Sequence, residues 1–286
     1  MDQKFIDLYD EYTHALLDRR EFLRRLSVLT GSIAAAIALL PLLENNQARA
    51  QIVPKNDPRL STEYIKYTGA TGEVRAYSAR PKGDGKLPGV VVIHENVGLV
   101  PHIEDVTRRV ALEGFLAIAP DAFSPLGGTP EDEKMVRELM GKLDSKLTTE
   151  NFVAAVKYLN THPLSTGKVG VVGFCWGGAV ANQMAVHSPD VLAVVPYYGR
   201  QPVAEDVPKI KASLLLHYAG DDAGINKGIP EYDAALKKAN VNYKLYMYEG
   251  AKHAFNSDTR PDRYHKEAAQ LAWQRTISFL KEKLKK

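Results

Sequence analysis

The sequence is poor in cysteine, since Cys175 is the only one among 286 residues. A single thiol cannot form a disulfide within one chain, which excludes a disulfide-held fold. Such a cysteine is either buried and inert or kept for its reactivity. Histidines at zinc-ligand spacing are lacking too: His94-Glu95 begins like a zinc-protease helix, but no second histidine follows it. We expect no metal site.

The sequence also has little net charge and no repeat. It contains 37 Lys+Arg and 34 Asp+Glu, a formal net charge of +3, with no basic stripe that would indicate a nucleic-acid partner. Gly167, Gly170 and Gly173 lie before and inside a predicted strand rather than after one, so they form no dinucleotide-binding loop and we expect no cofactor. With 45% hydrophobic and 25% charged residues, the composition is that of one large globular domain. We expect a monomer.

The first fifty residues have the pattern of an export signal. Arg19-Arg20 precede a run without charge at residues 26–43, and Ala48-Arg49-Ala50 follows with small residues typical of a cleavage site. The arginine pair followed by Phe22-Leu23 resembles a twin-arginine signal, in which Asp18 replaces the usual Ser or Thr. We therefore expect residues 1–50 to be a cleaved signal that contacts a membrane only in transit, and residues 51–286 to be a periplasmic bacterial domain.

Two other interpretations of this leader stay open. The charge-free run of 18 residues is close to the length of a bilayer span, which would make the leader an uncleaved membrane anchor, although Gly31 and Pro41 weaken that hypothesis. A leader helix that packs on the fold is disfavoured because residues 33–40 are apolar on every face.

Beyond residue 63, short apolar runs alternate with helical patterns, which predicts an α/β fold with a mostly parallel sheet flanked by helices. A turn signal at residues 69–72 joins the first two strands as a hairpin. Helices are predicted from the Thr129-Pro130 start to Met140, along the apolar stripe Phe152-Ala155-Val156-Leu159, and at residues 261–284. The predicted strands cover residues 64–68, 74–79, 89–94, 115–119, 168–174, 192–197, 213–218 and 243–248.

Cys175 stands in the motif Gly-Phe-Cys-Trp-Gly-Gly, at the turn between a predicted strand and a predicted helix. A nucleophile elbow needs small residues two positions before and after the nucleophile, and Gly173 and Gly177 meet this need. The helix N-terminus favours a thiolate and an oxyanion. The spacing therefore predicts a catalytic cysteine, against the alternative of a buried structural one.

The partners of such a nucleophile follow in the order that this type of fold uses. Adjacent carboxylates, Asp221 and Asp222, end one strand region, and His253 follows the next. Because parallel strands deliver their carboxyl ends to one edge, we expect these side chains to meet Cys175. The backbone N–H groups of Trp176 and Asn96 are the predicted oxyanion donors.

These motifs together resemble the dienelactone hydrolase (carboxymethylenebutenolidase) family of the α/β-hydrolase superfamily. The resemblance covers His94-Glu95, Pro120-Asp121-Ala122-Phe123, residues 173–178, Asp222 and His253, and extends from about residue 64 to the C-terminus. It implies an α/β-hydrolase fold, Cys175 as nucleophile, His253 as base, Asp222 rather than Asp221 as its orienting acid, and Glu95 holding the resting thiol protonated.

The sequence departs from the family where substrate is bound. Members active on dienelactone carry two arginines for the substrate carboxylate, and the matching places here hold Ser124-Pro125-Leu126 and Ser257. Arg200 and Arg260 are nearby candidates. The expected activity is hydrolysis of a small ester or lactone through a cysteine acyl-enzyme. A broad carboxylesterase or thioesterase and a non-catalytic thiol sensor are the alternatives. The predicted pocket walls are Trp176, Phe123, Tyr198 and Phe255.

Overall fold

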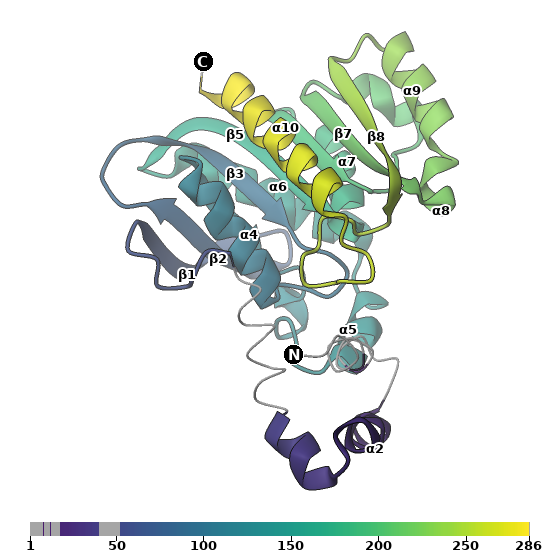
Figure 1. The fold of residues 1–286 in the computed structure, drawn as a ribbon. Coiled ribbons are helices and arrows are strands. Elements are labelled where there is room, and N and C mark those ends of the chain that lie inside the picture. The colour runs from purple at the N-terminus through teal and green to yellow at the C-terminus, as the bar shows by residue number, and fades with distance from the viewer. Residues whose placement is uncertain (1–7, 9–11, 13–17, 40–51, 286) are drawn as a thin grey trace.

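The computed structural model describes Leu8, Tyr12 and residues 18–39 and 52–285. An eight-stranded sheet in the order β1-β2-β4-β3-β5-β6-β7-β8 forms the centre of the body (Figure 1). Two antiparallel strands form its edge, and all other pairings are parallel. The strands are β1 (Leu60–Gly69), β2 (Gly72–Pro81), β3 (Leu87–Ile93), β4 (Leu116–Pro120), β5 (Ser165–Phe174), β6 (Val191–Tyr197), β7 (Ser213–Asp221) and β8 (Tyr243–Lys252).

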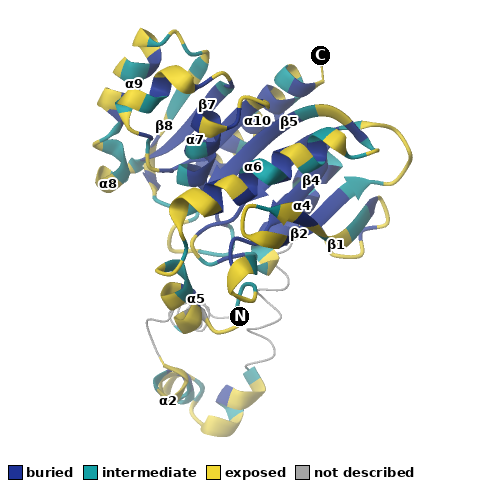
Figure 2. Cartoon of the chain, turned by 180° about the vertical axis from the view of Figure 1, so that it is seen from behind, coloured by how far each residue is buried: buried dark blue, intermediate teal, exposed yellow. Residues whose placement is uncertain are grey.

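Helices cover both faces of this sheet, as continuous apolar strands require. On β3, Val90 and Val92 pack toward one face, while Val91 and Ile93 pack toward the other. Figure 2 shows the central strands buried and the outer sides of the helices exposed. One face carries α4 (Pro101–Leu112) and α10 (Lys266–Leu284), and the other carries α6 (Ser145–Thr161), α7 (Trp176–His187) and α9 (Ile229–Lys238). The predicted fold class, an α/β fold with a mostly parallel sheet flanked by helices, is confirmed.

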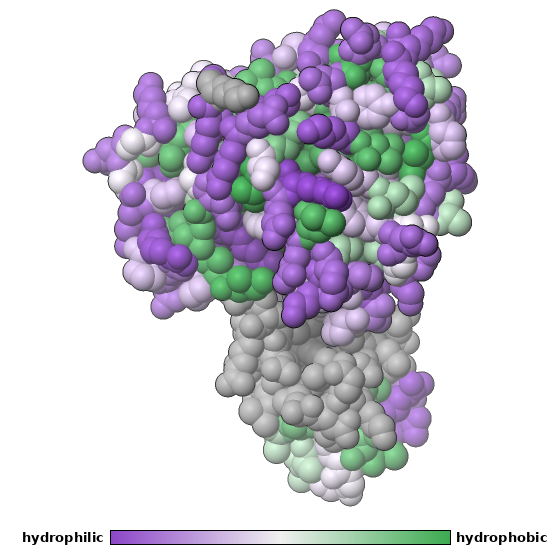
Figure 3. All heavy atoms as spheres, turned by 45° about the horizontal axis from the view of Figure 1, so that its top comes forward, coloured by the Kyte–Doolittle hydropathy of each residue, from purple (hydrophilic) through white to green (hydrophobic). Residues whose placement is uncertain are grey.

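Short elements complete the connections. They are the helices α5 (Glu133–Met140) and α8 (Ala223–Asn226) and the 3-10 turns η1 (Ser124–Leu126) and η2 (Ala204–Lys209). On the surface that Figure 3 presents, apolar residues of the body are scattered among hydrophilic ones. The body therefore buries its main apolar faces in the two layers beside the sheet.

Two predicted helix starts were wrong. α5 begins at Glu133 because Asp132 accepts a hydrogen bond from the Lys134 N–H, whereas the Thr129 hydroxyl donates to Asp121 instead of capping a helix. α10 begins only at residue 266, where the His265 side chain accepts from the Ala268 N–H. In both places a competing side-chain hydrogen bond sets the boundary.

The described part of the leader forms its own small apolar cluster. α2 (Arg19–Thr30) starts at the Asp18 cap and ends at Gly31. Phe22 and Leu26 are fully buried, and they pack with Leu8 and Ala36. In Figures 1 and 2, α2 lies apart from the sheet, beyond α5.

Arg19 and Arg20 are the first two residues of α2, and both are exposed. Among the described residues no single helix has the length and hydropathy of a membrane span, and α2 passes such a test only together with the helix at Ile33–Leu39, from which it bends by 104°. The end of the predicted apolar run and the predicted cleavage motif at residues 48–50 lie outside the described residues.

A buried arginine fixes the start of the body onto α4. The Arg108 side chain is fully buried, and it donates to the Val53 carbonyl over 2.8 Å and to the Tyr77 hydroxyl over 3.0 Å. The neighbouring Asp105 carboxylate accepts the backbone N–H groups of Ile52 and Val53. These hydrogen bonds hold residues 52–53 on α4, and they provide partners for the buried charges of Asp105 and Arg108.

Replacing Arg108 by alanine should destabilise the protein by about 3 kcal/mol, because the substitution leaves buried acceptors and the Asp105 charge with fewer partners. Urea unfolding followed by circular dichroism measures the change. As a matched control, Arg59→Ala removes an exposed arginine that pairs with Asp57, two residues away, and should cost less than about 1 kcal/mol. Equal losses for the two variants would contradict this account.

Candidate active site

The candidate site lies at one edge of the sheet, where the carboxyl ends of the parallel strands meet. Glu95 follows β3, Cys175 follows β5 and Tyr198 follows β6. Asp222 and His253 follow β7 and β8. Five connections that are far apart in sequence thus deliver polar or reactive side chains to one place, as expected for an open α/β sheet.

Cys175 occupies a strained turn between β5 and α7. Its backbone has φ 54° and ψ −114°, a combination that is rare for any residue other than glycine. Its N–H donates to the Tyr197 carbonyl over 3.0 Å, and its carbonyl accepts the Ala179 N–H over 3.1 Å. Backbone hydrogen bonds on both sides therefore hold the thiol in this conformation.

The two glycines of the predicted elbow are required by close backbone contacts. A Cβ at Gly173 would lie 2.1 Å from the Gly177 carbonyl oxygen. A Cβ at Gly177 would lie 2.3 Å from the His94 carbonyl oxygen. Any side chain at either position would therefore push the helix away from the strands, which explains the Gly-x-Cys-x-Gly spacing.

The structure brings Cys175, His253 and Asp222 together. His253 Nε2 lies 3.0 Å from Cys175 Sγ, and His253 Nδ1 lies 2.6 Å from Asp222 Oδ2. Because Asp222 accepts the Nδ1–H, the free electron pair of the imidazole is at Nε2 and faces the thiol. Asp221 lies one residue earlier and is exposed, so Asp222 is the carboxylate that contacts the histidine.

The thiol is held in its neutral form. The pKa of Cys175 is raised to about 11, first by burial and then by the negative charge of Glu95. The Trp176 N–H and the positive charge of Arg260 act in the opposite direction, while Asp222 adds to the rise. At neutral pH the S–H group therefore donates to His253, and a thiolate forms only when that proton is transferred.

Glu95 is positioned by the buried histidine before it. His94 Nε2 accepts the Ala122 N–H over 3.1 Å, so the imidazole proton is on Nδ1 and is donated to the Glu95 carbonyl over 2.5 Å. The His94 ring also stacks on Trp176, with centroids 5.3 Å apart. His94 therefore fixes the loop after β3 against the elbow, a role that the sequence motif alone did not reveal.

The two predicted oxyanion donors are the backbone N–H groups of Trp176 and Asn96. The Trp176 N–H lowers the pKa of the Cys175 thiol, which places this donor near the sulfur. Asn96 lies in the turn between Glu95 and Gly98, with its side chain exposed. The role of the Asn96 N–H stays a prediction.

Three of the four predicted pocket walls, Phe123, Tyr198 and Phe255, are buried. Tyr198, with φ 40°, places its ring 5.0 Å from the His253 ring. Phe255 packs against Tyr198, whereas Phe123 stacks on His94. Tyr198 therefore contacts the His253 ring directly, and the function of all three as substrate walls stays a prediction.

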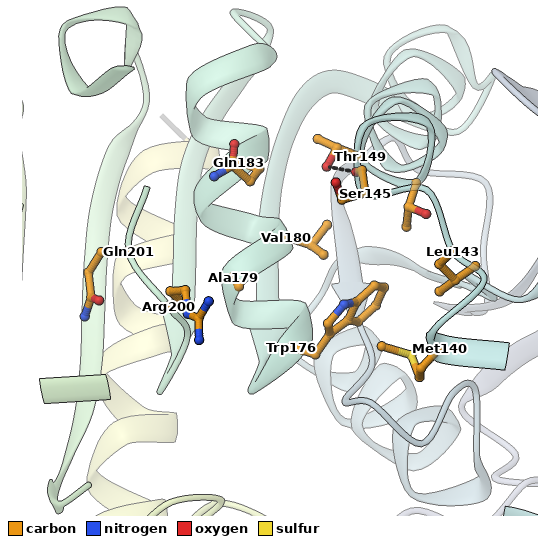
Figure 4. Close-up of a pocket in the computed structure, with 11 residues that line it drawn as sticks. Met140, Leu143, Ser145, Thr149, Trp176, Ala179, Val180, Gln183, Arg200 and Gln201 are labelled. Carbon is orange, nitrogen blue, oxygen red and sulfur yellow. Dashed lines mark hydrogen bonds between the residues drawn. The ribbon is translucent and has the colours of Figure 1, made fainter. Parts of the chain in front are cut away.

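A cavity of about 190 Å³ lies beside the elbow and reaches it through Trp176 (Figure 4). Met140 and Leu143 line one side of this cavity, Val180 of α7 lies between, and Arg200 lines the other side. Of the four predicted walls, Trp176 lines this cavity, whereas Phe123, Tyr198 and Phe255 do not. The other lining residues could not be predicted from the sequence, because they come from three separate segments of the chain.

The two positions where the family's arginines are expected are occupied by hydrogen-bonded serines. The Ser124 hydroxyl donates to the Asp121 carbonyl and accepts the Arg75 N–H. Ser257 is buried beside Thr259. Positive charge near the thiol comes instead from Arg260.

The described residues contain no group of three or more His, Cys, Asp or Glu side chains that could hold a metal ion.

Neutralising Glu95 should make the thiol more acidic, because its charge is one of the groups that raise the pKa of Cys175. Glu95→Gln should therefore increase the rate of alkylation by iodoacetamide at pH 8 by about fivefold or more. The control is Glu249→Gln, which removes an exposed carboxylate. An unchanged rate in Glu95→Gln, or an equal increase in both variants, would contradict the electrostatic role of Glu95.

The chain is similar to known proteins over most of its length. The family model described as the dienelactone hydrolase family matches residues 74–284, and a second model, described as YqhI-like, matches residues 1–30. A predicted carboxymethylenebutenolidase from Escherichia coli K12 is 33% identical over 248 residues, covering 81% of this chain and 90% of that protein. One from Methylorubrum extorquens is 30% identical over 276 residues, covering 91% and 93%.

The fold is also found among solved structures. The crystal structure of a predicted dienelactone hydrolase from Klebsiella pneumoniae matches with a TM-score of 0.69 and 29% identity, over 77% of this chain and 98% of that one. Residues 74–284, which the family model matches, contain the whole sheet edge described above, from β3 to β8. With an α/β-hydrolase fold and this extent of similarity, the chain belongs to the dienelactone hydrolase family.

Proposed function

We propose that this hydrolase cleaves small esters or lactones through a covalent acyl-enzyme on Cys175. The observation that carries the proposal is the position of His253, whose two ring nitrogens lie 3.0 Å from Cys175 Sγ and 2.6 Å from Asp222 Oδ2. A nucleophile, a base within hydrogen-bond reach and a carboxylate that orients the base are the parts that acyl transfer requires.

In the first half-reaction, His253 Nε2 accepts the thiol proton while sulfur attacks the substrate carbonyl. The new carbon–sulfur bond moves the carbonyl electrons onto oxygen, where the Trp176 N–H donates to the negative charge. When this intermediate collapses, the ester carbon–oxygen bond breaks, and the leaving alkoxide takes the proton from His253. In the second half-reaction His253 takes a proton from water, and the hydroxide attacks the thioester carbonyl. The carbon–sulfur bond then breaks, the thiolate takes the proton back from His253, and the acid is released.

Glu95 regulates the first of these steps. Its buried charge keeps the resting thiol protonated, which protects the single cysteine from oxidation in the absence of substrate. Substrate that enters beside Glu95 changes this local field and allows proton transfer to His253. The strained conformation of Cys175 keeps the sulfur exposed to the incoming carbonyl.

The serines at positions 124 and 257 favour substrates other than dienelactone itself. Neither position provides a positive charge, and the hydroxyl of Ser124 is already hydrogen-bonded within the protein. A carboxylesterase or thioesterase that accepts a broader range of acyl groups is therefore the second candidate function.

Loss of the nucleophile or its base should abolish turnover. With p-nitrophenyl acetate as substrate, Cys175→Ala and His253→Ala should each reduce kcat by about 10³-fold or more, and Asp222→Asn by a similar factor, since the three act as one unit. Release of p-nitrophenol, followed by absorbance, gives the rate. His187→Ala is the matched control, because His187 is an exposed histidine at the end of α7.

Turnover that survives in Cys175→Ala would contradict the nucleophile assignment. A thiol that reacts with iodoacetamide in a protein that turns over no ester, at a rate that His253→Ala leaves unchanged, would favour the thiol-sensor hypothesis instead.

We also propose that residues 1–50 direct export of the chain to the bacterial periplasm. The exposed pair Arg19-Arg20 at the start of α2 is available to a receptor. The buried residues Phe22 and Leu26 of this helix belong to a cluster separate from the two layers of the body. A membrane anchor formed by an uncleaved leader is the alternative.

If export uses the arginine pair, the double variant Arg19→Lys, Arg20→Lys should leave the protein in the cytoplasm of the producing bacterium. Immunoblots of cytoplasmic, periplasmic and membrane fractions measure its location. The control is Arg24→Lys, Arg25→Lys, which changes two arginines of the same helix. Unchanged periplasmic location in the first variant would contradict twin-arginine export, and wild-type protein in the membrane fraction would favour the anchor.

A further inference from the structure

The Thr129 side chain joins the loops that follow β3 and β4. Its hydroxyl group donates to Asp121 Oδ1 over 2.8 Å and accepts the Leu99 N–H over 2.9 Å. Its backbone N–H donates to Asp121 Oδ2 over 2.8 Å. Because one hydroxyl group donates to one loop and accepts from the other, it fixes the two loops relative to each other.

Asp121 anchors this link on the side of β4. Its carboxylate is buried, and it accepts the Phe123 N–H over 3.0 Å in addition to the two hydrogen bonds from Thr129. Gly127 and Gly128 both have a φ of 98°, which glycine adopts easily, and the Gly128 N–H donates to the Phe123 carbonyl. This reversal of the chain brings Thr129 back onto the charged carboxylate, whose hydrogen bonds are strong.

The other end of the link is the turn that contains Glu95 and Asn96. The Gly98 N–H closes this turn by donating to the Glu95 carbonyl over 3.3 Å. Gly98 has a φ of 89°, and a Cβ at this position would overlap Thr129 Oγ1. The backbone of the turn therefore lies directly against the threonine side chain, which also holds the next residue, Leu99, by its N–H.

Glu95 lies between two attachments to the loop after β4. Before it, His94 Nε2 accepts the Ala122 N–H, and after it the Leu99 N–H donates to Thr129. The Glu95 side chain is buried, and its negative charge raises the pKa of the Cys175 thiol. Loss of either attachment would therefore allow this charge to move relative to the sulfur.

We propose that Thr129 is a positioning residue of the active site, whose hydroxyl group holds residues 95–98 in place beside the Cys175 thiol. It acts through the Glu95 carboxylate and through the Asn96 N–H, the second predicted oxyanion donor. The expected effect on turnover rests on the proposed function. The expected effect on the reactivity of the thiol does not, since alkylation requires no ester hydrolysis.

A double-mutant cycle on thiol reactivity tests this role. Thr129→Val replaces the hydroxyl group by a methyl group of similar size, so the Leu99 N–H loses its partner and the turn loosens. Alkylation of Cys175 by iodoacetamide at pH 8 should become about threefold faster, because the Glu95 charge is then less well placed to oppose thiolate formation. In Glu95→Gln protein the same substitution should change the rate by less than about 1.5-fold, because the charge is already absent.

Two further variants separate this role from a general loss of stability. Thr129→Ser keeps the hydroxyl group and should restore the wild-type alkylation rate. Thr107→Val removes another threonine hydroxyl, which is buried and donates to the Ile103 carbonyl within α4, and the rate should not change. An unchanged rate in Thr129→Val, an equal increase with and without Glu95→Gln, or an equal increase in Thr107→Val would overturn the proposal.

Turnover of p-nitrophenyl acetate gives a second readout. Thr129→Val should reduce kcat by about tenfold and change KM by less than about twofold, because a misplaced oxyanion donor weakens binding of the transition state more than binding of the substrate. An unchanged kcat would overturn the action through Asn96. A wild-type protein that hydrolyses no ester would refute the proposed function, and the alkylation cycle would still decide the role of Thr129.

Discussion

The tight contact between the β5–α7 turn and its neighbours is the constraint on which the site depends. Gly173 and Gly177 can approach neighbouring carbonyl oxygens only because they lack a Cβ, and Cys175 keeps its strained backbone only because Tyr197 and Ala179 hold it by hydrogen bonds. Loosening this turn would move the thiol, the Trp176 N–H and the cavity wall together.

The electrostatics of the site favour a resting enzyme over a permanently activated one. Burial and Glu95 keep the thiol neutral, although His253 and the start of a helix lie beside it. His94 fixes the loop that contains Glu95. Its Nε2 accepts the Ala122 N–H, and its Nδ1–H is donated to the Glu95 carbonyl. In the proposed mechanism, substrate that enters beside Glu95 changes the field at the thiol and allows proton transfer to His253, so reactivity depends on occupancy of the site.

Sequence alone was sufficient where one residue type satisfies one local requirement. The elbow follows from glycine spacing, the strands from continuous apolar runs such as β3, and the meeting of Cys175, Asp222 and His253 from the parallel order of strands. The predicted starts of α5 and α10, at Thr129-Pro130 and residue 261, were wrong. The side chains of Asp132 and His265 cap these helices a few residues later. The cavity and the stacking of His94 on Trp176 depend on tertiary packing between distant segments, which leaves no local pattern.

The central claim is that acyl transfer passes through a covalent intermediate on Cys175. The most direct measurement is intact-protein and peptide mass spectrometry of protein quenched in acid within the first turnovers of p-nitrophenyl acetate. The account predicts one added acetyl group, located on the peptide that contains Cys175 and absent from Cys175→Ala protein. Turnover without any acetylated protein, or an acetyl group on another residue that persists in Cys175→Ala, would contradict it.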